Sequence, residues 1–249
     1  MRKMASKTFL AVMLLIVVFF ISGCGSSNGG NVKKVAYEII DDQGAMIQLE
    51  HKPERILTLA MGTDSIVLGI LPEEKLIAIN SLADDPVSSN IVDKANGITR
   101  KIKNPSAEEI LSLKPDVVFI YNWGKAEMVD NLRELGIKVV VVKGPKSIAD
   151  VKENVKLIAK TLGEEDKGNL MIAKMDDKLA EIKEKVDNIK PERRKKLVLI
   201  SLMTSYGGKG CTFDDICKYA GVINGVSDAG LHNGQLLTKE MLVDINPDL

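Results

Sequence analysis

The chain has 249 residues, of which 45% are hydrophobic and 27% are charged, a composition typical of globular proteins rather than disordered or fibrous ones. Lysine plus arginine and aspartate plus glutamate balance at 34 each, so the chain lacks the basic excess of a nucleic-acid-binding protein. A chain of this length can bury one large core or two smaller ones.

Residues 1–23 predict a signal peptide. A basic start, MRKMASK, precedes an uncharged apolar run of 13 residues at 9–21, which is too short for a comfortable membrane span of about 20 residues. The run ends at Ile21-Ser22-Gly23-Cys24, which resembles the lipobox of bacterial lipoproteins. This resemblance implies an extracytoplasmic protein anchored to the cell membrane by lipidated Cys24. The alternative is an uncleaved anchor helix.

Residues 24–34 contain GSSNGG and predict a flexible linker. The same letters match the G-x-S-x-G string of serine hydrolases. That motif needs a strand before it and a helix after it, and neither is expected here, so we discard it.

From residue 35 onward, short apolar runs alternate with helical patterns, which indicates α/β architecture with parallel strands. We expect an N-terminal lobe over residues 35–163. Its predicted elements are a hairpin at 37–56 turning at Asp42-Gln43-Gly44, strands at 55–60, 75–80, 116–121 and 137–143, and helices at 62–70, 106–114 and 125–136. The near-continuous valine and isoleucine of the strands suits a sheet buried on both faces.

Two helical patterns follow. Residues 147–163 predict a helix with an apolar stripe of Ile148, Val151, Val155, Ile158 and Leu162. Residues 164–190 predict a longer amphipathic helix with the stripe Ile172, Met175, Leu179, Ile182, Val186 and Ile189. A coiled coil would show a similar stripe, but the flanking strands favour packing against the same protein.

After Pro191 the order of elements begins again, and we expect a C-terminal lobe over residues 191–249. It contains a strand at 196–202, a Gly-rich loop, a helix at 212–221, a polar stretch and a helix at 237–245. The end of this lobe repeats a pattern of the first lobe. PSAEEILSLKPDVV and LLTKEMLVDINPDL each place a Glu seven positions before Pro-Asp, from Glu108 to Pro115 and from Glu240 to Pro247.

The first copy of this repeat continues into the strand at 116–121, whereas the second stops at Leu249. We therefore expect the C-terminal lobe to be incomplete and the sequence to be a truncated or partial product.

The segments KPERILTLA, LGI, SAEEILSLKPDVVF, the long helix and LLTKEMLVDINPDL together resemble the substrate-binding components of ABC importers, in the family that handles iron complexes and cobalamin. The resemblance covers nearly the whole chain from residue 35 onward and rests on the order and spacing of these segments. It implies the class III periplasmic-binding-protein fold, in which two α/β lobes with mainly parallel sheets are joined by the helix at 164–190. Ligand would lie between the lobes, at the carboxyl ends of the strands.

The resemblance also implies partners. In the family, one Glu on each lobe faces arginine residues of the membrane permease, and the matching positions are Glu108 and Glu240. A carboxylate in a first helical turn is favoured by the helix dipole, and arginine binds carboxylates bidentately. The alternative is that both acids only stabilise their helices. The expected partners are therefore an ABC permease with its ATPase, and the protein itself is expected to be a monomer.

Loops that follow strands are predicted to line the ligand site. The candidate ligand-binding residues are Met61, Tyr121, Asn122, Trp123, Tyr206 and His232. Flat aromatic rings suit a tetrapyrrole or a catechol-type chelate, although each ring could instead pack on its own loop. His232 could ligate a haem iron, but a lone His in a polar loop is more often a surface residue.

The expected ligand is a ferric siderophore, cobalamin or haem, with an iron chelate favoured, and no cofactor or protein metal site is expected. Cys211 and Cys217 could be free thiols or a disulfide. A surface-anchored enzyme and a sensor lipoprotein are the alternative functions. The chain has two histidines and no recognisable set of catalytic residues, so we expect no enzymatic activity.

Overall fold

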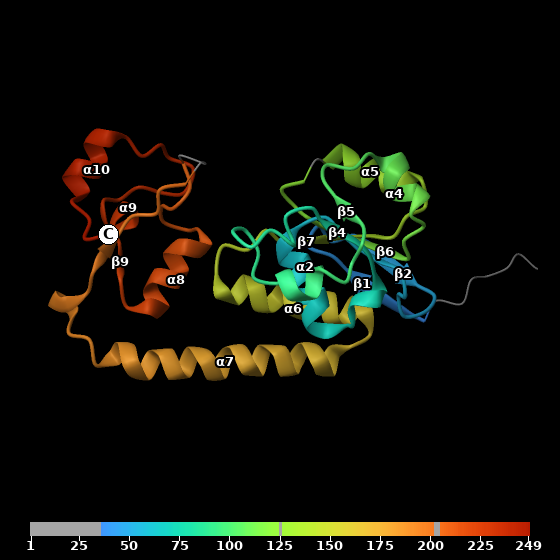
Figure 1. The fold of residues 1–249 in the computed structure, drawn as a ribbon, viewed down its shortest axis with the longest axis horizontal. Helices are drawn as coiled ribbons and strands as arrows, with labels where there is room; N and C mark the ends of the chain where they lie inside the picture. The colour runs from blue at the N-terminus through green and yellow to red at the C-terminus, as the bar shows by residue number, and fades with distance from the viewer. Residues whose placement is uncertain (1–35, 125, 202–204) are drawn as a thin grey trace, which may run out of the picture. The chain divides into compact units, whose positions relative to one another are not determined.

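The structure, a computed structural model, describes residues 36–124, 126–201 and 205–249. Val35–Leu249 forms one compact unit. Within the described residues the strands form an antiparallel pair β1-β2, a parallel five-stranded sheet in the order β5-β4-β3-β6-β7, and a parallel pair β8-β9. Helices connect the parallel strands, as Figure 1 shows, so the predicted α/β class is confirmed.

The bounds of the elements are as follows. The strands are β1 Tyr37–Ile40, β2 Met46–Leu49, β3 Ile56–Thr58, β4 Leu76–Asn80, β5 Lys101–Ile102, β6 Val117–Tyr121, β7 Val139–Val142, β8 Lys196–Leu197 and β9 Ile223–Asn224. The helices are α2 Met61–Ile70, α3 Val92–Ala95, α4 Ala107–Ser112, α5 Ala126–Glu134, α6 Ile148–Leu162, α7 Glu165–Asp187, α8 Thr212–Ala220, α9 Gly225–Asp228 and α10 Lys239–Ile245, with 3-10 turns at Glu73–Lys75 and Pro191–Arg193.

The predicted hairpin is present and covers one edge of the five-stranded sheet. Asp41 holds its turn, because one carboxylate oxygen accepts hydrogen bonds from the backbone N–H groups of Gln43 and Ala45, both at 2.9 Å. The other oxygen accepts from Arg133 at 2.7 Å and from the backbone N–H of Val141 in β7 at 3.1 Å. The buried Asp41 carboxylate thus occupies backbone donors that an open sheet edge would expose.

The five-stranded sheet is buried on both faces, as its sequence predicts. In β6, Val117, Phe119 and Tyr121 belong to the core that contains α2 and α6. The alternate residues Val118 and Ile120 belong to the core that contains α4 and α5. Figure 1 shows these two helix pairs on opposite faces of the sheet. This period-two division is why an almost uninterrupted apolar strand is needed here.

The structure corrects three expectations from the sequence. β5 was not predicted, because its two residues lie in a basic stretch. The polar stretch after Gly221 contains β9 and α9. The strand expected at 196–202 is assigned only at Lys196–Leu197, and residues 202–204 lie outside the described ranges. Strands of two residues carry no alternation that a pattern can detect.

The predicted long helix is present as α7, one continuous helix (Figure 1). Its apolar stripe is half-buried from Ile172 to Val186, whereas Ile189 lies beyond the helix and is exposed. Two side chains of the helix lie against glycines of the same chain. A Cβ atom added to Gly69 of α2 would come 2.0 Å from the methyl carbon of Met171, and one added to Gly221 after α8 would come 2.4 Å from Val186. The helix therefore packs against its own protein, as expected.

The repeated Pro-Asp segments occupy equivalent places. The Asp116 carboxylate accepts hydrogen bonds from the backbone N–H groups of Glu54 and Arg55, at 2.8 and 2.9 Å, just before β3. The Asp248 carboxylate accepts from the backbone N–H of Lys196 in β8 at 2.8 Å. In return, the backbone N–H groups of Asp116 and Asp248 donate to Arg55 and Lys196, both at 2.8 Å. We call each reciprocal contact a Pro-Asp clasp.

Both clasps are preceded by a residue in the left-handed region, Lys114 at φ 49° and Asn246 at φ 46°. After the first clasp, Val117 pairs with Ile56 as the strand β6 begins. After the second clasp, the carbonyl of Leu249 accepts a hydrogen bond from Val198 at 3.0 Å. Leu249 thus takes the position in its lobe that Val117 takes in the first, and the sequence repeat is a structural repeat.

The first clasp yields a stability prediction. Asp116→Ala leaves two backbone donors at the start of β3 without their acceptor, so we expect the free energy of unfolding in urea to fall by about 1–3 kcal/mol. Asp116→Asn keeps an oxygen acceptor and should lose less. Asp130→Ala, on the exposed side of α5, should change it by less than about 0.5 kcal/mol. Equal losses for Asp116→Ala and Asp130→Ala would contradict the role of the clasp.

Candidate functional site

The carboxyl edge of the five-stranded sheet brings three of the predicted ligand-binding residues together. Tyr121 is the last residue of β6, and Trp123 follows it in the adjoining turn. Their ring centroids are 4.4 Å apart and the ring planes are inclined by 40°. Met61 was expected in a loop after β3, but it is half-buried as the first residue of α2. It still lies at the carboxyl end of β3, which is the neighbour of β6 in the sheet.

Two glycines make room for these rings. A Cβ atom on Gly62 would come 2.2 Å from the Tyr121 hydroxyl oxygen, and one on Gly144 would come 2.1 Å from the Trp123 ring. No side chain other than hydrogen fits at either position without moving an aromatic ring. Trp123 is 67% exposed while Tyr121 is 6% exposed. The pair therefore presents one open ring that rests on a buried one.

Asn122 fixes the turn between the two rings. Its side-chain amide donates to the Asp42 carboxylate at 2.8 Å, and its side-chain oxygen accepts from the backbone N–H of Gly144 at 3.0 Å. These contacts tie the end of β6 to the β1-β2 hairpin and to the segment after β7. Asn122 thus stabilises the turn and holds Gly144 under Trp123.

Tyr206, the candidate from the C-terminal lobe, lies beside the start of α8. Burial and the neighbouring Cys211 thiol raise the pKa of the half-buried Tyr206. Thr212, the first residue of α8, donates its hydroxyl to the carbonyl of Pro145 at 2.8 Å. Pro145 directly follows Gly144, on which Trp123 rests. Thr212, Pro145 and Gly144 therefore connect the start of α8, beside Tyr206, with the Trp123 ring.

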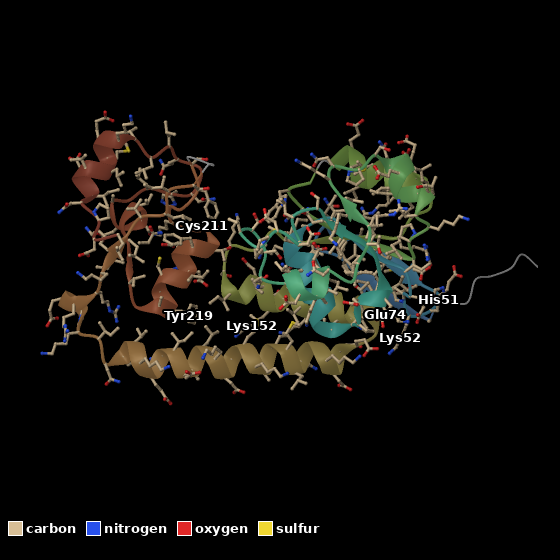
Figure 2. The ribbon with its side chains drawn as sticks, in the orientation of Figure 1. His51, Lys52, Glu74, Lys152, Cys211 and Tyr219 are labelled. Carbon is tan, nitrogen blue, oxygen red and sulfur yellow. The ribbon has the colours of Figure 1, made fainter. Side chains whose placement is uncertain are left out.

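A second contact joins the same elements. The Asp215 carboxylate in the first turn of α8 accepts a hydrogen bond from the backbone N–H of Ile148, the first residue of α6, at 2.9 Å. Cys211, at the start of α8 in Figure 2, and Cys217 are both buried free thiols. The disulfide that the sequence left open is thus not formed in this structure.

His232 is exposed, and its backbone makes the contacts that hold its loop. Its N–H donates to the side-chain oxygen of Gln235 at 2.6 Å, and the residue forms an isolated parallel bridge with Lys209. In the part of the chain that the structure describes, no group of three or more His, Cys, Asp or Glu residues could hold a metal ion. His232 therefore stays a predicted ligand contact without support from neighbouring ligating groups.

Glu108 and Glu240 occupy matching positions in the two lobes. Each is the second residue of its helix, α4 or α10, and each is exposed. The helices are capped in the same way: the Ser106 hydroxyl accepts from the backbone N–H of Glu109 at 3.2 Å, and the Thr238 hydroxyl accepts from Met241 at 3.2 Å. The two carboxylates thus lie at the surface in two copies of one structural setting.

The pKa values of both carboxyls respond to this setting in the same direction. Hydrogen bonding to the glutamate's own backbone N–H, followed by bonding to the capping hydroxyl of Ser106 or Thr238, lowers the pKa of Glu108 and of Glu240. Both groups are therefore held in the charged form that an arginine would bind.

Pockets found elsewhere do not include the candidate residues. One of about 350 Å³ lies between β2 and β7, with Met46, Arg133 and Lys138 in its lining. Another of about 340 Å³ lies beside α9 and α10, with Asp228, Met241 and Asp244 in its lining. The candidate edge is open to solvent at Trp123, whose side chain is exposed.

The predicted lipid anchor Cys24, the signal peptide and the linker lie outside the described residues. Among the residues that are described, no helix combines the length and the apolar character needed to cross a membrane.

Comparison with known proteins identifies the family of the chain. The family model for periplasmic binding proteins matches residues 63–249. The chain is 24% identical to the uncharacterized ABC transporter substrate-binding lipoprotein YvrC of Bacillus subtilis, over 94% of this chain and 77% of that protein. It is 25% identical to the Fe(3+)-citrate-binding protein YfmC of the same bacterium, over 98% of this chain and 79% of that protein.

The probable siderophore-binding lipoprotein YfiY, also of B. subtilis, is 27% identical over 75% of this chain, and the match spans 57% of its own length. Among solved structures, the periplasmic heme-binding protein RhuT from Roseiflexus sp. RS-1 superposes with a TM-score of 0.68, at 23% identity over 78% of this chain and 74% of that chain. The heme-binding protein HmuT gives 0.69, at 22% identity over 85% and 69%. These structures share the fold predicted from the sequence.

The family model covers far more than half of the chain, and the solved structures share its α/β fold with a long helix. The chain therefore belongs to the periplasmic binding protein family.

Proposed function

We propose that this protein is a membrane-tethered solute-binding component that delivers a ferric chelate, such as ferric citrate or a ferric siderophore, to an ABC importer. The observation that carries the proposal is the pair of exposed glutamates, Glu108 and Glu240, in two copies of the same capped helix. A partner with two similar subunits, each offering arginine residues, would meet equivalent carboxylates on both lobes. The names of the relatives favour import over an enzymatic or sensor function.

Glu108 and Glu240 are proposed to dock on the permease. Both side chains are exposed, so a partner can reach them, and neither contributes to a core. Hydrogen bonds from the backbone N–H of each glutamate and from the capping Ser106 or Thr238 hydroxyl lower the pKa of both carboxyls, which favours their charged form. The docking surface is therefore separate from the groups that hold the fold.

The ligand is proposed to bind over the Trp123 ring, with Met61, Tyr121 and Asn122 in the same edge and Tyr206 and His232 from the C-terminal lobe. The open face of Trp123 suits contact with a flat, delocalised chelate. In this proposal Tyr121 supports the ring from below and Asn122 keeps the turn in place. Corrinoid and haem ligands are alternative outcomes of the binding test.

Ligand binding can be followed through the emission of Trp123, the only tryptophan. We expect ferric citrate or a ferric siderophore to quench this emission at micromolar concentration, whereas citrate or the iron-free siderophore should not. Gly144→Ala pushes a methyl group into the Trp123 ring and should weaken binding about tenfold or more. Cobalamin and haemin are titrated in parallel.

Gly97→Ala is the matched control, because its added Cβ meets only the flexible carboxylate of Glu73. Its affinity should equal that of the unmodified protein. If no chelate changes the emission of Trp123, or if Gly144→Ala binds as well as Gly97→Ala, the proposed ligand site is wrong.

Docking is tested with the double variant Glu108→Ala/Glu240→Ala. Chelate affinity should stay unchanged, while uptake by cells that express the permease and ATPase should fall at least about tenfold, because each lobe loses one charged contact. The control is Glu109→Ala/Asp244→Ala, which removes exposed acids from the same two helices. A loss of chelate binding in the first variant, or equal uptake by both variants, would contradict docking through Glu108 and Glu240.

Anchoring through Cys24 is also proposed, on the resemblance of residues 21–24 to a lipobox and on relatives that are named lipoproteins. Radiolabelled palmitate should be incorporated into the unmodified protein and not into Cys24→Ser. Label retained by the Cys24→Ser variant would show that the anchor lies elsewhere.

A further inference from the structure

A buried carboxyl group lies directly beneath the proposed ligand edge. Asp64, in the first turn of α2, has no exposed surface. Its carboxylate accepts a hydrogen bond from the Thr58 hydroxyl at the end of β3 and one from the backbone N–H of Asn80 at the end of β4, the latter at 3.2 Å. Asp64 thus joins the ends of two neighbouring strands to the helix that begins at Met61.

Asp64 also acts on the aromatic pair. Burial and the Asp64 charge raise the pKa of Tyr121 to about 12, so the phenol lies within the field of this carboxylate. The Tyr121 hydroxyl is closely packed against Gly62, two residues before Asp64. Tyr121 in turn supports Trp123 at a centroid distance of 4.4 Å. Asp64 therefore reaches the exposed tryptophan through one intervening ring.

Groups from four strands act on Asp64 or respond to it. Thr58 of β3 and Asn80 of β4 donate hydrogen bonds to it, while Lys101 of β5 and Tyr121 of β6 interact with it through charge alone. Lys101 is the only charged group among them, and its ammonium donates to the carbonyls of Ala95 and Ile98 and pairs with Asp84 at 3.4 Å. Because this cation has other partners, it neutralises Asp64 incompletely.

Burial raises the pKa of Asp64 to about 7, against the lowering influence of Thr58, the Asn80 N–H and Lys101. A raised carboxyl pKa means that the folded protein holds a proton that the unfolded chain releases at lower pH. The contribution to stability is fully present below the unfolded value, 3.8, and is lost as the pH rises through about 7. The carboxyl thus changes its charge within the physiological range.

The C-terminal lobe contains the same arrangement with the opposite electrostatic result. Asp214, buried in the first turn of α8, accepts hydrogen bonds from the backbone N–H of Gly210 at 3.2 Å and from the side-chain amide of Asn224, at the end of β9, at 3.0 Å. Burial raises the pKa of Asp214, but bonds from Gly210, Ser227 and Asn224 outweigh it and hold the value below its usual range. Asp214 stays ionised and is a matched control for Asp64.

We propose that Asp64 is a positioning residue for the ligand edge, and that gain or loss of its proton changes how Tyr121 and Trp123 lie. As a carboxylate, Asp64 accepts from Thr58 and Asn80 and repels electron-rich groups above it. As a neutral acid it carries an O–H donor and has one acceptor oxygen fewer for these contacts. The two states therefore hold the ends of β3 and β4, and the phenol beside them, differently.

The first experiment needs no ligand. The emission of Trp123 is recorded between pH 5.5 and 8.5 for the unmodified protein, Asp64→Asn, Asp214→Asn and Tyr121→Phe. The unmodified protein and Asp214→Asn should show a transition with a midpoint near pH 7. Asp64→Asn should show none and should emit like the unmodified protein at low pH, because an amide resembles the neutral acid. Tyr121→Phe should reduce the amplitude of the transition.

His51 and His232 are present in every variant, so a transition that survives Asp64→Asn would assign the effect to them and overturn the proposal. An unchanged transition in Tyr121→Phe would overturn the path through the phenol. If Asp64→Asn does not fold, Lys101→Met replaces it. Removal of this cation must move the midpoint to higher pH, and an unmoved midpoint overturns the assignment to Asp64.

The second experiment rests on the proposed ligand site. Affinity for ferric citrate is measured for the unmodified protein and Asp64→Asn at pH 6 and pH 8. At each pH the dissociation constant of the unmodified protein is divided by that of Asp64→Asn, so that changes in the chelate itself cancel. We expect a ratio near one at pH 6 and about fivefold weaker binding by the unmodified protein at pH 8, where Asp64 repels the anion. Equal ratios at both pH values would refute the link to ligand affinity. If ferric citrate does not bind at all, the proposed ligand is wrong and the emission test still decides the role of Asp64.

Discussion

Parallel pairing of β5, β4, β3, β6 and β7 is the constraint on which the rest of the structure depends. Because all five strands run in one direction, every segment that follows a strand emerges at the same edge of the sheet. Met61, Asn80 and Trp123 are separated by up to 62 positions in the sequence and still belong to that edge, which is also where Asp64 is buried. The parallel sheet therefore determines where the candidate site lies, and the side chains determine what can bind there.

The second organising feature is a pair of carboxylates that each lobe uses in the same way. One belongs to the Pro-Asp clasp and fixes the start of β3 or β8, through Asp116 or Asp248. The other is buried in the first turn of the following helix and meets the end of β4 or β9, through Asp64 or Asp214. Backbone donors at strand ends lack ladder partners, and a carboxylate satisfies them with charge-assisted bonds. The two lobes differ in this second carboxylate. Asp64 accepts hydrogen bonds from Thr58 and Asn80, whereas Asp214 accepts them from Gly210, Ser227 and Asn224.

The sequence predicted the long apolar elements well. It predicted poorly the very short strands and the residues whose role depends on contacts with distant segments. The strand VVFIY and the stripe of α6 carry a period that identifies them without a structure. The two-residue strands β5 and β9 carry no such period, and Met61 was placed in a loop because a helix start before Gly-Thr has no capping residue. Gly144 and Asp64 were missed because their importance lies in what approaches them from other strands.

By itself the sequence determined the α/β class, the order of the long apolar elements and the repeat that pairs Glu108 with Glu240. These follow from apolar periodicity and the spacing of Glu, Pro and Asp, which are local properties of the chain. The family entered as a resemblance of several segments taken together. Only the tertiary structure decided that Trp123 rests on Gly144 beside Tyr121, that Cys211 and Cys217 are free thiols, and that Asp64 lies buried among four strands. Packing distance and desolvation arise between segments far apart in the sequence, so no local pattern encodes them.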